Sequence, residues 1–280
     1  MSIELKVAEV IQKPVGRDIS GVDYSFPTNG LADMLLFTDG TGTEVKNYVS
    51  DRPSGIIEHP TTSNNAFSWL TGGGVLIEGT EIISLPSFDA SQAWSLVHVG
   101  TLMGSVGGTA AERIGAILGF REFGVAPTRG FILAVRAGGN DWSLASASPA
   151  LQGRMMNAGT PGTIENLSPN PGINGLLRQP RITVLSHDGN GVITAGLYRG
   201  DGSLVCSDTY TSHPISQMFV NGGVTQTTLT PCAGTSSTTY SNSKQQVEMF
   251  ARYDRVLNSS DVLQIGTAIS RICEKRGRYW

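Results

Sequence analysis

The chain has few charged residues, few cysteines and no long apolar run. Asp, Glu, Lys and Arg make up 15% of its 280 residues, below the roughly 25% that is usual in soluble domains. The net charge is −3, so we expect no general attraction to nucleic acid or to anionic lipid. No stretch approaches the ~20 consecutive apolar residues of a membrane helix. The start lacks a basic segment followed by an apolar core, so we expect neither membrane insertion nor a signal peptide.

The three cysteines are Cys206, Cys232 and Cys273, which are far apart and form no CxxC pair. An odd number at this spacing argues against a disulfide framework and against a zinc site. The four histidines are equally scattered. We therefore expect buried thiols and no metal site built on Cys or His.

Glycine is abundant, with 35 of the 280 residues against a usual share of roughly 7%. Hydrophobic residues make up 39% of the chain, enough to fill one large core. Short runs rich in Val, Ile, Leu and Phe are separated by turn residues, which predicts a β-sandwich or β-barrel. The predicted strands cover residues 33–38, 75–77, 81–85, 93–99, 114–120, 130–137, 181–186, 192–199, 204–207 and 247–253.

Two turn motifs join three of these strands. The first contains Asp188-Gly189 and Asn190-Gly191, and the second contains Asp201-Gly202. These dipeptides readily take the positive φ of tight hairpin turns. The sequence therefore predicts a three-stranded meander over residues 181–208.

The strand over residues 247–253 alternates apolar residues with Glu248 and Arg252. This period of two predicts one face in the core and one largely solvated face. After it, Asn258 to Asp261 supply capping residues for a helix that we expect to cover one end of the sandwich. The apolar stripe of this helix consists of Val262, Ile265, Ile269 and Ile272.

Three further segments differ in character from the rest. Residues 1–30 show no sustained period and are interpreted as an attachment arm. Residues 209–243 contain no charged side chain, so they form either a long surface loop or an uncharged hairpin that lies on a partner. The basic tail, residues 271–280, is either a solvated helix end or a docking tail.

The segment from Gln246 to Val262, with Tyr253, Arg255 and Leu257 before the capping residues, resembles the closing strand and helix start of laminin-G-like, concanavalin A-like jelly rolls. Residues 35–47, 94–99 and 181–203 are similar to the opening strand, a central Trp-containing strand and a strand pair of that family. The resemblance covers residues 31–270. It implies an all-β fold, a concanavalin A-like jelly-roll sandwich of two antiparallel sheets with one short C-terminal helix, over residues 31–280.

Some members of this fold are glycoside hydrolases, which need two carboxylates flanking the scissile bond. The paired carboxylates of a Glu-x-Asp-x-x-Glu strand are missing here, and the nearest acidic pairs are Glu78 with Glu81 and Asp18 with Asp23. No Gly-x-Ser-x-Gly elbow and no phosphate-binding loop is present. We therefore expect a protein that is not an enzyme.

The resemblance also implies binding of glycans, or of Ca²⁺, through Asp and Asn side chains in the end loops. The candidates are Asn140, Asp141 and Trp142 in one loop, and Asp188 and Asn190 in another. The competing interpretation is an ordinary turn beside a core Trp for the first set, and an ordinary hairpin turn for the second. No run of three alternating acids predicts a strong Ca²⁺ site, so no cofactor is expected.

Such domains occur in secreted proteins, bacterial surface proteins and phage appendages. In its sparse charge and its odd cysteine count, this chain resembles the phage examples most. We expect a virion protein of a phage or prophage, a tail fibre, receptor-binding protein or capsid appendage. It would be made in the bacterial cytoplasm, would contact other virion proteins or host surface glycan, and would form a homo-oligomer, a trimer being the family habit. A soluble lectin-like module is the alternative, and a polysaccharide depolymerase with an unrecognised site is the third possibility.

Overall fold

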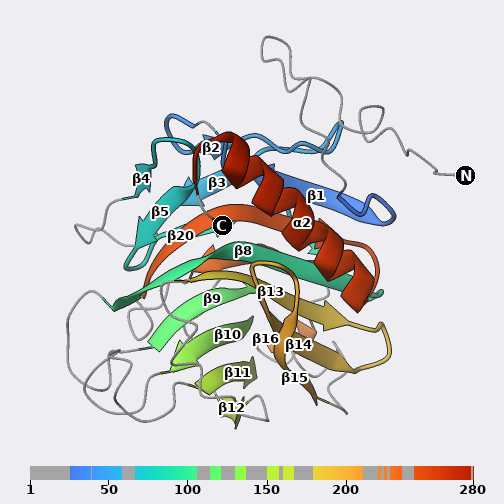
Figure 1. Cartoon of the computed structure of the whole chain (residues 1–280). Coiled ribbons are helices and arrows are strands. Elements are labelled where there is room, and N and C mark those ends of the chain that lie inside the picture. Colours follow the sequence, from blue (N-terminus) through green and yellow to red (C-terminus); the bar gives the residue numbers. More distant parts are fainter. Residues whose placement is uncertain are drawn as a thin grey trace, which may run out of the picture.

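Two antiparallel β-sheets stack face to face, and one helix covers the outer surface of the first sheet (Figure 1). This arrangement confirms the expected all-β sandwich with one C-terminal helix. The computed structural model describes residues 26–38, 40–58, 67–105, 114–120, 130–136, 150–157, 160–166, 179–210, 220–221, 224–225, 228–234, 243–278 and 280.

The first sheet has the long strands β8 and β20 at its centre. Strand β20 pairs with β8 along its length, while β5 pairs with the first half of β20 and β1 with the second half. In spatial order the strands are β15 (Leu204–Tyr210), β14 (Ile193–Arg199), β13 (Pro180–His187), β8 (Trp94–Ser105), β20 (Ser243–Tyr253), β5 (Val75–Glu78) and β4 (Ser68–Trp69), with β1 (Leu31–Leu36) on β20.

The second sheet lies on the other side of the core. Its strands, in spatial order, are β12 (Thr160–Asn166), β11 (Ala150–Asn157), β10 (Gly130–Arg136), β9 (Ile114–Phe120), β19 (Pro231–Gly234), β6 (Ile82–Ser84), β3 (Gly55–Glu58) and β2 (Glu44–Val45). Two short pairs complete the described strands: β16 (Val220–Asn221) with β17 (Val224–Thr225), and β18 (Thr228–Leu229) with β7 (Phe88–Asp89).

The interior between the sheets holds two apolar clusters. One gathers around Trp94 and Phe120, and the other around Phe37 and Phe250. A third apolar cluster lies outside this layer, between the first sheet and the helix. Burying apolar side chains contributes about 25 cal/mol per Å² removed from water, so both faces of the first sheet stabilise the fold.

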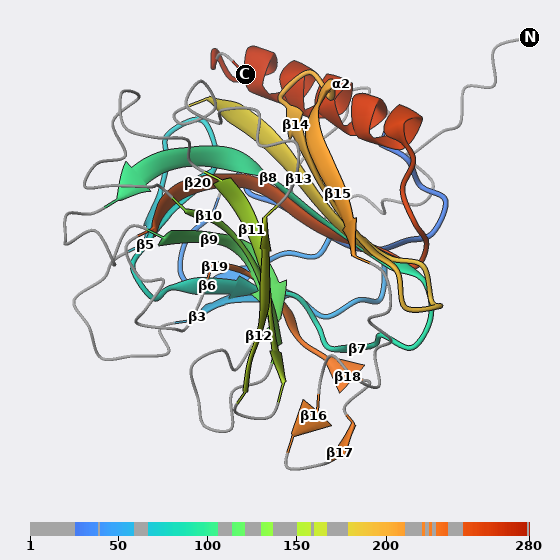
Figure 2. The ribbon, with the colours of Figure 1, turned by 90° about the horizontal axis from the view of Figure 1, so that it is seen from below.

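Helix α2 (Ser259–Lys275) lies across the outer face of the first sheet, not over an end of the sandwich as expected from the sequence. Figure 2 shows it outside the layer of β8, β13 and β20, with β6 and β9 on the far side of that layer. The predicted stripe does pack inward, with Ile265 and Ile269 buried. The stripe shows that the helix has a partner surface but does not identify which surface it is.

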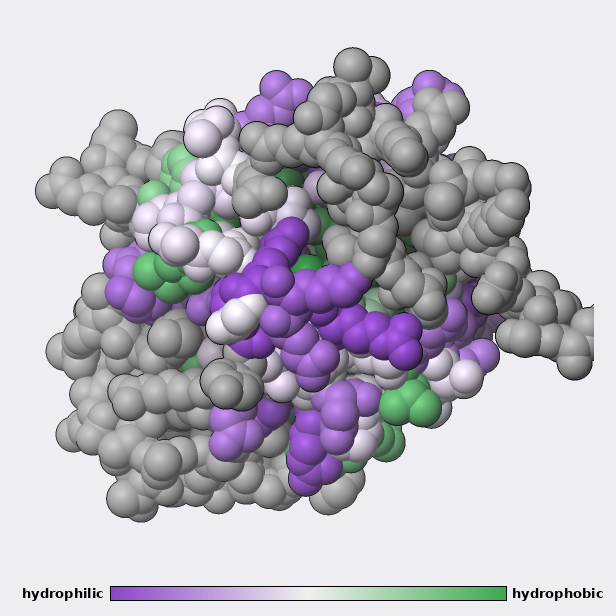
Figure 3. Space-filling view, turned by 45° about the horizontal axis from the view of Figure 1, so that its top comes forward, coloured by the Kyte–Doolittle hydropathy of each residue, from purple (hydrophilic) through white to green (hydrophobic). Residues whose placement is uncertain are grey.

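The N-terminal end of α2 is capped as the sequence indicates. The Asn258 side chain accepts a hydrogen bond from the Asp261 amide at 3.0 Å, and the Asp261 carboxylate accepts one from the Asn258 amide at 2.8 Å. This reciprocal capping box satisfies two free amides of the first turn. Figure 3 shows hydrophilic side chains along the outward surface of the helix, consistent with a helix that is packed on one side only.

Strand β20 corrects one expectation. Neither of its faces is solvated: Met249 and Ala251, at positions expected in the core, face the helix, while Phe250 lies between the sheets. Glu248 and Arg252 are 6% and 5% exposed. Polar side chains at these positions are accommodated by ion pairs, Arg252 with Asp33 and Glu248 with Arg278.

Only part of the uncharged span 209–243 is described, and it includes the short antiparallel pair of β16 and β17. Another part, β19, is an interior strand of the second sheet, between β9 and β6, which neither expectation included. Its residues Cys232 and Ala233 are buried. A strand that is buried on both faces needs no charge, which explains part of the missing charge.

The structure confirms the predicted meander of β13, β14 and β15. The three cysteines are buried, and none of them forms a disulfide. No helix among the described residues has the length and apolar character to cross a membrane. Of the expected attachment arm, residues 1–25 lie outside the described residues, and so do Asn140, Asp141 and Trp142.

Candidate functional site at one end of the sandwich

Two loops meet at the end of the sandwich where β13 finishes and β8 begins. The turn after β13, residues 188–192, contains Gly189 with φ +84°. A Cβ atom on Gly189 would lie 3.2 Å from the backbone nitrogen of Ala93. Glycine therefore satisfies both the turn and this close approach, and the two loops form one continuous surface.

Asp188, a predicted site residue, holds the turn together. Its Oδ1 accepts hydrogen bonds from the amides of Asn190 at 2.7 Å and Val192 at 3.0 Å. Burial raises the pKa of Asp188, but these amides and the neighbouring His187 outweigh that effect, and its pKa lies below the usual value. The carboxylate is therefore ionised near neutral pH, and within the described chain its Oδ2 accepts no hydrogen bond from the protein.

Three more exposed polar side chains belong to the same two loops, and we call the set with Asp188 the polar rim. Asn190 is exposed, and its carboxamide makes no hydrogen bond to a described residue. Asp89 is exposed, and its Oδ1 accepts from the Ser91 amide at 2.9 Å, a bond that lowers the pKa of Asp89. Gln92 is also exposed. The polar rim thus consists of Asp89, Gln92, Asp188 and Asn190.

An aromatic stack supports the polar rim from inside. The His187 ring lies on Trp94, with ring centroids 5.8 Å apart and an angle of 25° between planes. His187 Nδ1 lies 3.1 Å from the Gly189 amide nitrogen, from which it accepts a hydrogen bond, and 3.5 Å from the Gln92 carbonyl oxygen. Burial lowers the pKa of His187, so the ring is neutral and holds the turn in place. Trp94 is 1% exposed and is not available to stack on a ligand.

A buried charge network at the same end was not predicted from the sequence. The Asp33 carboxylate accepts from Asn47 Nδ2 at 2.9 Å, from Arg52 Nε at 2.8 Å and Nη2 at 3.1 Å, and from Arg252 Nε at 2.8 Å. The Arg252 guanidinium lies 4.6 Å from the ring centroid of Phe88, whose ring packs edge-on against Trp94. Asp33 is 0% exposed and fully bonded, so it fixes the end of the sandwich and offers no free carboxylate. In the sequence, the only indication of this network is the acidic residue Asp33 at the start of an apolar run.

Other acidic residues lie elsewhere. Glu78 pairs with Lys244, and Glu81 is 2% exposed. Asp18 and Asp23 lie outside the described residues. In the described part of the chain, no group of three or more His, Cys, Asp or Glu side chains could hold a metal ion.

Comparisons with solved structures give the same architecture. The Trypanosoma rangeli sialidase in complex with sialic acid matches 86% of this chain and 33% of its own, with 16% identity and a TM-score of 0.51. The botulinum neurotoxin serotype D binding domain matches 85% of this chain and 50% of its own, with 10% identity and a TM-score of 0.52. Domain 4 of AbnA, a GH43 extracellular arabinanase from Geobacillus stearothermophilus, matches 84% of this chain and 98% of its own, with 13% identity and a TM-score of 0.53.

These likenesses define the class of fold as a β-sandwich, consistent with a jelly roll. The chain spans a third of the length of the sialidases. No family model and no curated protein matches the sequence. At such low identity the likeness extends to the fold alone.

Proposed function

We propose that this protein is a carbohydrate-binding module. The observation that carries the proposal is the likeness to domain 4 of AbnA, which this chain matches over 98% of that domain and which was solved in complex with arabinotriose. The sialidase of similar fold was solved with sialic acid. Support from this chain comes from the polar rim, whose carboxylate and amide groups can accept and donate the hydrogen bonds of sugar hydroxyls.

We assign the glycan contacts to the rim residues Asp188 and Asn190, together with Asn140, Asp141 and Trp142 from the sequence. Asp188 is held by two backbone amides, so its free oxygen is already positioned before a ligand arrives. Preorganisation of this kind lowers the entropy cost of binding. Trp142 would supply the apolar face on which a sugar ring packs.

The proposal is for binding without cleavage. Hydrolysis of a glycosidic bond needs two carboxylates on opposite sides of it. The Asp33 carboxylate already accepts hydrogen bonds from four donor atoms, and Glu78 forms an ion pair with Lys244. These contacts support a non-catalytic role, and release of reducing sugar from a bound polysaccharide would overturn it in favour of a depolymerase.

A glycan array probed with the purified full chain, followed by calorimetric titration of the bound glycans, tests the binding role. Asn190→Ala and Asp188→Asn should weaken binding, as should Trp142→Ala. Asp201→Asn is the matched control, because Asp201 caps the other hairpin turn through the same contact, from the Ser203 amide at 2.8 Å. Absence of binding to any glycan, or equal binding by all four variants, would overturn the proposal.

The setting of the module is proposed from the sequence. We infer that it belongs to a phage or prophage particle, with its N-terminal arm attached to other virion proteins and the protein assembled as an oligomer, a trimer being favoured. The sparse charge and the resemblance of residues 246–262 support this inference. Mass spectrometry of purified particles should find the chain, and light scattering should find an oligomer. A stable monomer missing from the particles would favour a soluble lectin-like module.

A further inference from the structure

The polar rim contains a dipeptide with a chemistry of its own. Asn190 and Gly191 stand at the tip of the turn between β13 and β14. The Asn190 carboxamide is exposed and makes no hydrogen bond to any residue that the structure describes. Asn190 keeps a negative φ, while Gly191 has φ +100°. No described residue makes a hydrogen bond that holds the side chain away from the next peptide.

The amide of Gly191 is free in the same sense. Asp188 Oδ1 takes the amides on either side of it, those of Asn190 and Val192. Among the described residues, the Gly191 amide donates no hydrogen bond. A peptide nitrogen without an acceptor can turn toward the side-chain carbonyl of the preceding residue, and glycine has no side chain to obstruct that approach.

We propose that Asn190 is a site of spontaneous deamidation in the folded protein. The Gly191 nitrogen attacks Cγ of Asn190, a C–N bond forms, the nitrogen loses its proton, and the side-chain nitrogen leaves as ammonia from the exposed side of the turn. Water then adds to either carbonyl of the resulting five-membered succinimide and opens it. The products are aspartate and isoaspartate at position 190. Water and a proton carrier are the only co-reactants.

A second Asn-Gly pair in the described chain provides an internal comparison. Asn29 precedes Gly30, but Arg255 Nε donates to the Asn29 carbonyl at 2.8 Å, and the Asp254 amide donates to the Gly30 carbonyl at 2.7 Å. A Cβ atom on Gly30 would lie 3.1 Å from Arg255 Cγ. These contacts hold the backbone of Asn29 and Gly30 in place, so we expect the rotation that ring closure needs to be slower there than at Asn190.

The product changes the polar rim. Either acid places a second negative charge two residues from Asp188, and isoaspartate adds a methylene group to the backbone of the turn. A longer backbone disturbs the hydrogen bonds that Asp188 accepts from the amides of residues 190 and 192. The effect on glycan contact rests on the proposed function, whereas the modification itself does not.

Peptide mapping by mass spectrometry tests the proposal on the full folded chain, aged in mildly alkaline buffer. The peptide that contains Asn190 should gain the mass of an amide-to-acid change several-fold faster than the peptide that contains Asn29. In denaturant the two rates should converge, and Asn190→Gln should abolish the change at that peptide. A folded chain in which Asn29 reacts as fast as Asn190, or in which Asn190 reacts only in denaturant, would overturn the proposal.

Discussion

Single charged residues matter in this protein because they are few and several are buried. Asp33 has no exposed surface and accepts from Asn47, Arg52 and Arg252. Its bond to Arg252 joins residues 219 positions apart in the sequence. Such a bond fixes β1 against β20 at the end of the sandwich that carries the polar rim.

Replacing Asp33 with Asn should destabilise the fold by about 3–5 kcal/mol, because it leaves a buried Arg252 without its principal counter-charge. Asp254 provides the control, because it pairs with the same guanidinium but is 62% exposed. Asp254→Asn should cost less than about 1 kcal/mol. Denaturant unfolding of both variants measures the difference, and equal losses would contradict a structural role for the buried pair.

His98 gives a pH dependence with a defined sign. Burial lowers its pKa from 6.5 to about 4, against the opposing effect of Gln245. In the unfolded chain His98 therefore binds a proton below pH 6.5, whereas in the folded chain it binds that proton only below about pH 4. The contribution of His98 is fully present above pH 6.5 and is lost on acidification, by about 3 kcal/mol in all. Unfolding free energies measured between these pH values should fall less steeply in His98→Gln, and an unchanged slope would count against this assignment.

The candidate site could be predicted from the sequence only in part. The dipeptides Asp188-Gly189 and Asn190-Gly191 identify a tight turn because positive φ restricts which residues fit. The network around Asp33 could not be predicted, since its partners come together only when β1 and β20 pair. The loop partner of the turn, Ala93, was equally hidden, because loop-to-loop contact leaves no periodic pattern.

Among the elements, α2 is tied to the sheet through glycine. A Cβ atom on Gly266 would lie 2.7 Å from the carbonyl carbon of Asp201 and 2.8 Å from the backbone oxygen of Gly200. The turn between β14 and β15 therefore packs directly on the helix backbone. This contact places the meander under α2.

Gly266→Ala separates two effects of opposite sign. Helix propensity alone favours alanine by about 1 kcal/mol, whereas the contact with the backbone of residues 200–202 forces the helix outward. We expect the steric effect to dominate, so the midpoint of thermal unfolding should fall. A rise in the midpoint would show that helix and turn are packed less closely. Thr267→Ala, at an exposed neighbour, is the control.

The elements themselves were predicted unevenly. Strand β9 has the predicted bounds, Ile114–Phe120, because an apolar run stands between turn residues. Strands β11 and β12 were missed, since Gly153, Pro161 and Gly162 interrupt any alternation. Strand β19 was missed because its four residues include Pro231 and Gly234. Sheet pairing sustains these strands where local propensity is weak.

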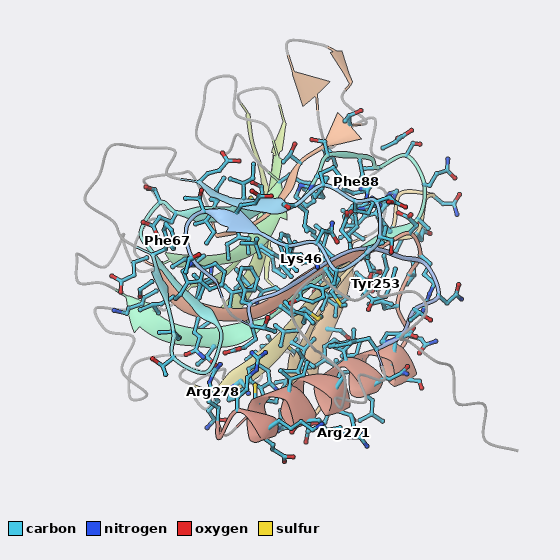
Figure 4. The ribbon with its side chains drawn as sticks, turned by 90° about the horizontal axis from the view of Figure 1, so that it is seen from above. Lys46, Phe67, Phe88, Tyr253, Arg271 and Arg278 are labelled. Carbon is cyan, nitrogen blue, oxygen red and sulfur yellow. The ribbon has the colours of Figure 1, made fainter. Side chains whose placement is uncertain are left out.

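At the scale of the whole molecule, the basic tail closes the structure over the first sheet. Arg278 donates to both oxygens of Glu248, and Trp280 donates to the Gly200 carbonyl at 3.0 Å. The turn before β5 packs against the Arg278 side chain, because a Cβ atom on Gly72 would lie 3.2 Å from it. Figure 4 shows Arg278 beside the C-terminal end of α2. The tail therefore docks on its own chain, in agreement with the docking alternative and not with a solvated helix end.

Arg278→Met should lower the free energy of unfolding by about 3 kcal/mol, because it leaves the buried Glu248 carboxylate without its counter-charge. It should also expose α2 to limited proteolysis before the sheets unfold, since the tail holds the helix end. Gln264→Ala, on the exposed face of α2, is the control. Unchanged proteolysis of α2 in Arg278→Met would contradict the anchoring role of the tail.

Hydrogen exchange of the full chain, with and without a glycan that it binds, tests the central claim most directly. The account predicts slower exchange on binding in the two loops of the polar rim, residues 88–93 and 187–192, while the second hairpin turn, residues 199–203, stays unchanged. Protection confined to other parts of the molecule, or no protection with a saturating glycan, would contradict a carbohydrate-binding role for this end of the sandwich.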